Sequence, residues 1–192
     1  GARRAEHVFG RALADVRLHD LYALNLHPRL ATIHAAARAG KPFVVFAQSM
    51  IPHHEQAIEM AEIALDPTVG AGPAVVELAA RVQGGQDPEI DLMTEWLTAW
   101  EQPVQMDMSD GHSMEDMEGM MSAEQMDALA AATGAEFDQL WLEMMIEHHT
   151  GAISMADTVK ADGSNPDVRV LADQIITAQQ AEIEEMQQLL AG

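Results

Sequence analysis

Four long segments of the chain carry apolar residues at the spacing of one helical face. In "FVVFAQSMIPHHEQAIEMAEIAL", residues 43–65, apolar positions recur every three or four residues, while Glu55, Glu59 and Glu62 fall on the opposite side. An amphipathic helix has to bury its apolar stripe against another element. The pattern therefore predicts an all-α protein. The predicted helices cover residues 43–65, 74–99, 135–160 and 167–190.

Two of these segments contain nearly the same sequence. "MIPHHEQAIEMA" (50–61) and "MIEHHTGAISMA" (145–156) share 8 of 12 residues at an offset of 95. Further along, "VVELAARVQGGQDPEIDLMTEWL" (75–97) aligns with "VRVLADQIITAQQAEIEEMQQLL" (168–190) at an offset of 93. The sequence therefore predicts an internal duplication of a helical hairpin. Two such hairpins favour a four-helix bundle.

The repeat also predicts how the chain is divided. A basic helical arm is expected first, docked on the acidic bundle through charge and apolar contacts, and the duplicated bundle follows it. Within the bundle, a Met-rich crossover joins the two hairpins and is expected to end in a short helix capped by Ser122 and Gln125. The predicted boundaries are 1–41 for the arm, 42–192 for the bundle, 42–101 and 134–192 for the hairpins and 102–133 for the crossover.

The second predicted helix contains an irregular stretch that the fourth does not have. Gly84, Gly85 and Pro88 stand where the second repeat has ordinary helix formers. Proline removes a backbone donor and crowds the preceding turn. We therefore expect a kink or bulge near Gly85.

Histidines fall on the apolar faces of the first and third predicted helices. His53 and His54 share a side of the helix with Met50 and Met60. The third helix repeats the arrangement with His148, His149, Met145 and Met155, and the second and fourth helices add Glu89, Met93, Glu182 and Met186 at core spacing. Because a buried carboxylate is costly unless it is paired or bound to metal, these residues are candidate metal ligands. In the alternative interpretation, His and Glu side chains satisfy each other in a structural core.

The residue three positions before the first histidine of each pair indicates which metal is favoured. Ferritin-like di-metal proteins use Glu-x-x-His at this point, whereas this chain has Met50-x-x-His53 and Met145-x-x-His148. A thioether in place of a carboxylate favours Cu(I) or Ag(I) over iron. A di-metal oxidoreductase using iron or manganese with His53, His148, Glu89 and Glu182 is the alternative. A further alternative is a metal-free helical bundle that acts as a protein-interaction module.

The crossover between the hairpins is rich in methionine. Seven of the 21 residues from 106 to 126 are methionine. Thioethers bind Cu(I), so the segment is a candidate capture site, although adaptable packing or compositional bias would give the same pattern. The candidate ligands are Met106, Met108, His112, Met114, Met117, Met120 and Met121. Unlike histidine, which is expected to lose its metal as the pH falls through about 6.5, thioethers do not titrate.

Composition narrows the class of function. The formal charge is −21, distributed as +4 over residues 1–41 and −25 over the remainder, so nucleic acid is not expected as a partner of the bundle. No apolar run of about 18 residues predicts a membrane span, and no signal segment is visible in this chain. There is no cysteine. A protein whose soft ligands are thioether and imidazole keeps them in an oxidising compartment, which favours an extracytoplasmic location, secreted or periplasmic.

With these residues assembled, the chain resembles the domain of unknown function 305 family (DUF305), which is marked by a repeated Met-Ile-x-His-His with Ala-x-x-Met following. The resemblance covers about residues 43–192 and implies a ferritin-like helical bundle, usually exported, with copper binding in some relatives. It does not imply an enzyme. The predicted function is Cu(I) buffering or delivery, in which a copper-accepting protein is a possible partner. Family marks fall on Met50, His53, His54, Met60, Met145, His148, His149 and Met155.

Overall fold

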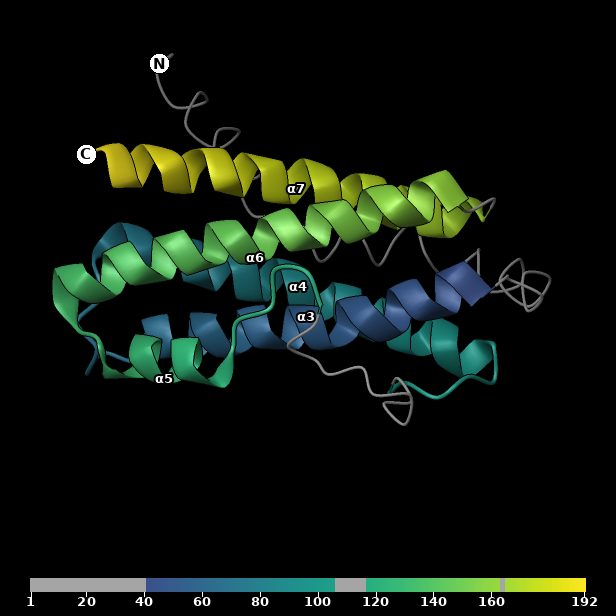
Figure 1. Ribbon diagram of the computed structural model, residues 1–192, viewed down its shortest axis with the longest axis horizontal. Helices are drawn as coiled ribbons and strands as arrows, with labels where there is room; N and C mark the ends of the chain where they lie inside the picture. Colours follow the sequence, from purple (N-terminus) through teal and green to yellow (C-terminus); the bar gives the residue numbers. More distant parts are fainter. Residues whose placement is uncertain (1–40, 106–116, 163–164) are drawn as a thin grey trace, which may run out of the picture.

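The computed structural model describes residues 41–105, 117–162 and 165–192. Within these ranges the protein has five helices and no strand, which confirms the all-α prediction for them. The helices are α3 (Lys41–Leu65), α4 (Pro73–Ala99), α5 (Ala123–Ala131), α6 (Gly134–Asp162) and α7 (Pro166–Ala191) (Figure 1). The four long helices begin and end within two residues of the predicted positions. The predicted arm lies outside the described residues, except for Lys41, which begins α3.

Local sequence signals account for the helix ends. Pro73 and Pro166 occupy the first turns of α4 and α7, where a missing backbone N–H costs nothing. The Asn165 side chain accepts hydrogen bonds from the first backbone N–H groups of α7. Ser122 and Gln125 form the predicted capping box at the start of α5. These caps confirm the short helix expected at the end of the crossover.

The irregular stretch of α4 does not interrupt the helix. α4 is α-helical without a break across Gly84, Gly85 and Pro88, so the bulge expected near Gly85 is not found. Both glycines are exposed, and a Cβ added to either would meet no atom within 4 Å. Because these residues lie on the solvent side, the core face of α4 keeps its helical spacing through this stretch.

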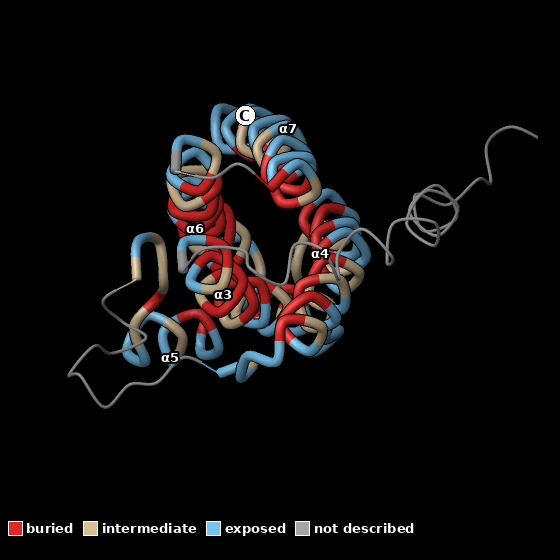
Figure 2. Tube along the Cα trace, turned by 90° about the vertical axis from the view of Figure 1, so that its right-hand side faces the viewer, coloured by how far each residue is buried: buried red, intermediate tan, exposed pale blue. Residues whose placement is uncertain are grey.

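The long helices pack side by side. α3 packs along α4 and α6 packs along α7, while α3 and α6 join the two pairs (Figure 1). α4 and α7 contact each other much less, and α5 lies against α3 and α6. Seen end-on, the buried residues face inward from all four long helices (Figure 2). Duplicated hairpins in a ferritin-like bundle stay a prediction.

Two apolar clusters fill the interior. The first apolar cluster takes residues 57–64 of α3 and 137–145 of α6, and the second takes residues 43–51 of α3 and 152–159 of α6. On both helices the histidines fall between the two clusters, which also shows that α3 and α6 run in opposite directions. The buried polar residues of α4 and α7 also lie between the two apolar clusters. The resulting polar layer consists of His53, His54, Gln86, Glu89, His148, His149, Gln179 and Glu182.

None of the helices in the described part of the chain is both long and apolar enough to cross a bilayer.

Candidate metal centre

The polar layer places all four histidines of the repeated motif in the interior. His53, His54, His148 and His149 have no exposed surface, as their apolar helical faces predicted. Glu55, Glu59 and Glu62 are exposed on the opposite side of α3. Helical spacing thus sends the imidazoles inward, between the two apolar clusters.

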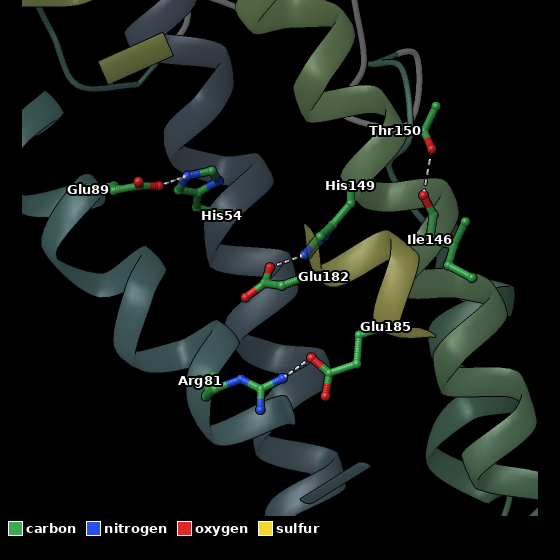
Figure 3. A network of polar contacts seen from close by, with 8 residues as sticks. All are labelled: His54, Arg81, Glu89, Ile146, His149, Thr150, Glu182 and Glu185. Atoms are coloured by element: carbon green, nitrogen blue, oxygen red, sulfur yellow. Dashed lines mark hydrogen bonds and ion pairs between the residues drawn. The ribbon is translucent and has the colours of Figure 1, made fainter. Parts of the chain in front are cut away.

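Two of the histidines are hydrogen-bonded to carboxylates of the neighbouring helix. His54 Nε2 lies 2.8 Å from Glu89 Oε2, and His149 Nε2 lies 2.7 Å from Glu182 Oε2 (Figure 3). A carboxylate accepts, so each Nε2–H donates. Neither Nδ1 has a partner among the described residues. We call His54 and His149 the carboxylate-bonded pair.

The other two histidines face each other across the contact between α3 and α6. The ring centroids of His53 and His148 are 3.7 Å apart, with an angle of 40° between the ring planes. None of their four ring nitrogens has a hydrogen-bond partner in the described part of the protein. We call His53 and His148 the facing pair.

Burial keeps the facing pair neutral. Desolvation, followed by the charges of His54 and His149, lowers the pKa of His53 from 6.5 to about 3. Desolvation also holds the pKa of His148 well below 6.5, and the charge of His53 adds to the effect. The sequence predicted proton competition near the unperturbed value of 6.5, whereas burial lowers the pKa of His53 far below that value. Neutral imidazole is the form that binds metal.

The imidazole nitrogens without partners are candidate metal donors. A buried polar atom without a hydrogen bond is costly, and native proteins rarely leave such atoms unsatisfied. Here six imidazole nitrogens of the four histidines lack partners in one layer. A metal ion bound to some of them would remove that cost. Metal-bound histidines commonly donate their second N–H to a carboxylate, as His54 and His149 do.

The predicted methionine ligands divide between the interior and the crossover. Five of them flank the polar layer without exposed surface, namely Met50, Met60, Met93, Met145 and Met186. Met155 is half-buried, as are Met117 and Met120, whereas Met121 packs in the first apolar cluster. The predicted ligands Met106, Met108, His112 and Met114 lie outside the described residues.

The structure does not bring every predicted ligand together. Within residues 41–105, 117–162 and 165–192, no three His, Asp or Glu side chains form a group that could hold one metal ion. In particular, Glu89 and Glu182 are bonded to the carboxylate-bonded pair and not to His53 or His148. The four-residue set of the di-metal alternative is therefore not assembled in this arrangement.

Sequence reasoning missed the residues that hold the end of the crossover against the helices. Gln56 bonds the backbone of Met121, and Ser154 bonds Glu118. The signal was present in the repeat, because positions 56 and 151 are among the four that differ between the two matching windows. A residue that differs from its repeat partner inside a matching window is a candidate for a role that only one repeat has.

Helices that enclose a buried layer of histidine, glutamate and glutamine define a helical protein with a candidate metal centre. The chain belongs to the family described as domain of unknown function (DUF305), whose model matches residues 44–190. No curated protein matches the sequence.

Three solved structures are similar to this chain. A DUF305 fragment from Deinococcus radiodurans is 31% identical, with a TM-score of 0.71, covering 80% of this chain and 97% of that one. A predicted secreted DUF305 protein from Streptomyces coelicolor is 30% identical, with a TM-score of 0.68 and coverage of 76% and 88%. CopM in its Cu(II)-bound form is 36% identical, with a TM-score of 0.65 and coverage of 78% and 95%. CopM has also been solved with Cu(I) and with silver.

Proposed function

We propose that this protein binds Cu(I) in the polar layer and acts as a non-catalytic protein that buffers or delivers the ion outside the cytoplasm. The observation that carries the proposal is the facing pair, whose four ring nitrogens are buried and have no partner among the described residues. The similarity to CopM, solved with copper and silver, supports the same ion class.

The facing pair would supply the primary donors. Two neutral imidazoles can hold Cu(I), which accepts low coordination numbers and prefers soft or intermediate ligands. The carboxylate-bonded pair is held by Glu89 and Glu182 and would not join the facing pair in one ligand group. Met50 and Met145, one turn before the facing pair on the same helical faces, would add thioethers.

The proposal extends to the architecture and the location of the protein. Residues 42–192 would form a ferritin-like bundle of two duplicated hairpins, and the thioethers of the crossover would capture Cu(I) from solution. The absence of cysteine and the DUF305 relative from Streptomyces coelicolor support an extracytoplasmic location. Delivery would require a copper-accepting protein as partner.

A competition titration of the full chain against a coloured Cu(I) chelator tests the proposal. The His53→Leu/His148→Leu variant should lose affinity by about 100-fold or more, because both primary donors are replaced by apolar groups. The matched variant His54→Gln/His149→Gln removes the same number of imidazoles but keeps an amide donor for each glutamate. This variant should lose Cu(I) affinity by about tenfold or less.

Two results would contradict the proposal. Wild-type protein that does not compete for Cu(I) at micromolar concentration refutes copper binding altogether. Equal affinity in the wild type and in His53→Leu/His148→Leu would leave the histidines structural, as expected for a metal-free interaction module.

A further inference from the structure

The part of the crossover that directly precedes α5 is fastened to both α3 and α6. We call residues 117–121 the strap. The Gln56 side chain makes two hydrogen bonds to Met121, with Oε1 2.7 Å from the backbone N and Nε2 2.9 Å from the backbone O. On the other side, Ser154 Oγ donates to Glu118 Oε2 at 2.7 Å. The strap is therefore held at both of its ends.

Glycine at two positions allows the strap to lie directly on the α6 backbone. A Cβ added to Gly151 would lie 2.1 Å from the Glu118 backbone O and 2.7 Å from Gly119 Cα. Gly119 has a φ of +82° and would bring a Cβ within 3.0 Å of the His148 backbone O. No larger residue fits at position 151 unless the strap moves. The strap thus rests on the turn of α6 that carries His148.

The two repeats differ at the positions that hold the strap. Gln56 aligns with Gly151, and Glu59 aligns with Ser154. In the first repeat the longer Gln56 side chain reaches the strap, and in the second the missing side chain admits it. Glutamate at position 154 would place a like charge beside Glu118, where Ser154 donates a hydrogen bond instead. The two repeats therefore hold the strap in complementary ways. We call Gln56, Gly151 and Ser154 the clamp.

Gln56 and Gly151 lie on opposite sides of the facing pair. Gln56 is three residues beyond His53, and Gly151 is three residues beyond His148. Since α3 and α6 run in opposite directions, these equal steps lead away from the pair in opposite directions. The strap therefore crosses over the pair from Gly151 to Gln56. The backbone of Glu118 lies close enough to the His53 ring to oppose, in part, the lowering of its pKa by burial.

We propose that Gln56, Gly151 and Ser154 are positioning residues that clamp the strap over the facing pair, so that metal reaches and leaves His53 and His148 only when the strap lifts. This inference rests on the proposed function. It is supported by the lack of any exposed surface on either histidine.

A mostly apolar groove lies beside the strap. The groove has a volume of about 410 Å³ and runs between α3 and α6, and Glu118 and Ser154 line it together with Ser49 and Met155. The Glu118–Ser154 bond is therefore part of the groove wall.

Stopped-flow mixing of the full chain with Ag(I), followed by tryptophan fluorescence, tests the clamp. Gln56→Ala removes two hydrogen bonds to the strap, and Gly151→Ala forces Glu118 away. Each should raise the rate constants of Ag(I) uptake and release by about tenfold while the equilibrium affinity changes much less. The matched controls are Gln139→Ala on the exposed face of α6 and Gly84→Ala on that of α4, and both should keep the wild-type rates.

A second readout on the same proteins does not depend on metal. The Met121 amide, which donates to Gln56, should exchange its hydrogen faster in Gln56→Ala than in the Gln139→Ala control. Wild-type rates of Ag(I) uptake in both clamp variants would overturn the inference and leave copper binding intact, since a merely structural role lowers stability without changing these rates. If no protein of the set binds Ag(I), the proposed function fails and the inference fails with it.

Discussion

His53 and His54 are neighbours on α3, as His148 and His149 are on α6, yet the two members of each doublet have different surroundings. His54 and His149 each donate to a carboxylate, whereas the rings of His53 and His148 pack against each other and have no carboxylate partner among the described residues. Adjacent residues of a helix point about 100° apart, so one histidine reaches α4 or α7 and the other reaches across the contact between α3 and α6. Each doublet thus contains one histidine that is held by glutamate and one that has no carboxylate partner among the described residues.

The pH dependence of stability should expose this difference most strongly. The folded-state pKa of His53 is about 3 and the unfolded value is about 6.5, so the unfolded chain binds the proton first as the pH falls. The metal-free protein should therefore be fully stabilised above pH ~6.5 and lose stability below it, by about 2 kcal/mol from His53 alone between pH ~8 and pH ~5. His148 adds to the loss, because its pKa is lowered too.

Urea unfolding at several pH values measures this effect. The His53→Leu/His148→Leu variant serves as the control and should show a much weaker dependence over the same range. Identical pH profiles for the two proteins would show that the facing pair does not resist protonation.

Removal of Glu89 should break the first carboxylate contact. Glu89→Leu leaves His54 Nε2 buried without an acceptor, and the free energy of unfolding should fall by about 2 kcal/mol. The control is Glu59→Leu on the exposed side of α3, for which we expect a change within about 0.5 kcal/mol. Equal losses for the two variants would mean that His54 does not depend on Glu89.

Replacement of the facing pair should have the opposite sign. In the metal-free protein, His53→Leu/His148→Leu exchanges unsatisfied buried nitrogens for apolar groups, which should raise the free energy of unfolding by about 1.5 kcal/mol. Chemical denaturation of metal-free samples measures the change, with His54→Leu as the comparison that should be destabilised. A loss of stability in the facing-pair variant would identify these histidines as structural.

The smallest effect is expected at the second carboxylate. The Glu182 side chain is 20% exposed and that of Glu89 is 8% exposed, so water can replace Glu182 more easily as the partner of histidine. Glu182→Leu should therefore cost about 1 kcal/mol, roughly half the loss at Glu89. Denaturation of the two single variants side by side tests the ranking, and a larger loss at Glu182 would reverse it.

Much of this organisation was accessible from the sequence. Helical spacing predicted the bounds of the long helices and the inward direction of His53 and His54, because apolar stripes and polar faces were clearly separated. The repeat predicted that Glu89 and Glu182 occupy equivalent places in the core, although Glu182 keeps some exposure.

Other features depend on tertiary packing and could not be predicted. Helical spacing does not say how far each helix turns about its axis, so it left open which histidine of a doublet meets the glutamate. The strap is held largely through its backbone, which leaves little trace in residue type beyond Gly119 and Gly151. The pKa of His53 depends on its complete burial, an effect that the unperturbed histidine pKa does not include.

The identity of the metal ligands tests the central claim most directly. X-ray absorption spectroscopy of the Cu(I)-loaded full chain distinguishes scattering by the atoms of an imidazole ring from scattering by a thioether sulfur. The account predicts imidazole scattering in the wild type that disappears in His53→Leu/His148→Leu and persists in His54→Gln/His149→Gln. A spectrum of sulfur ligands alone in the wild type, or one that the facing-pair variant leaves unchanged, would contradict the assignment of Cu(I) to His53 and His148.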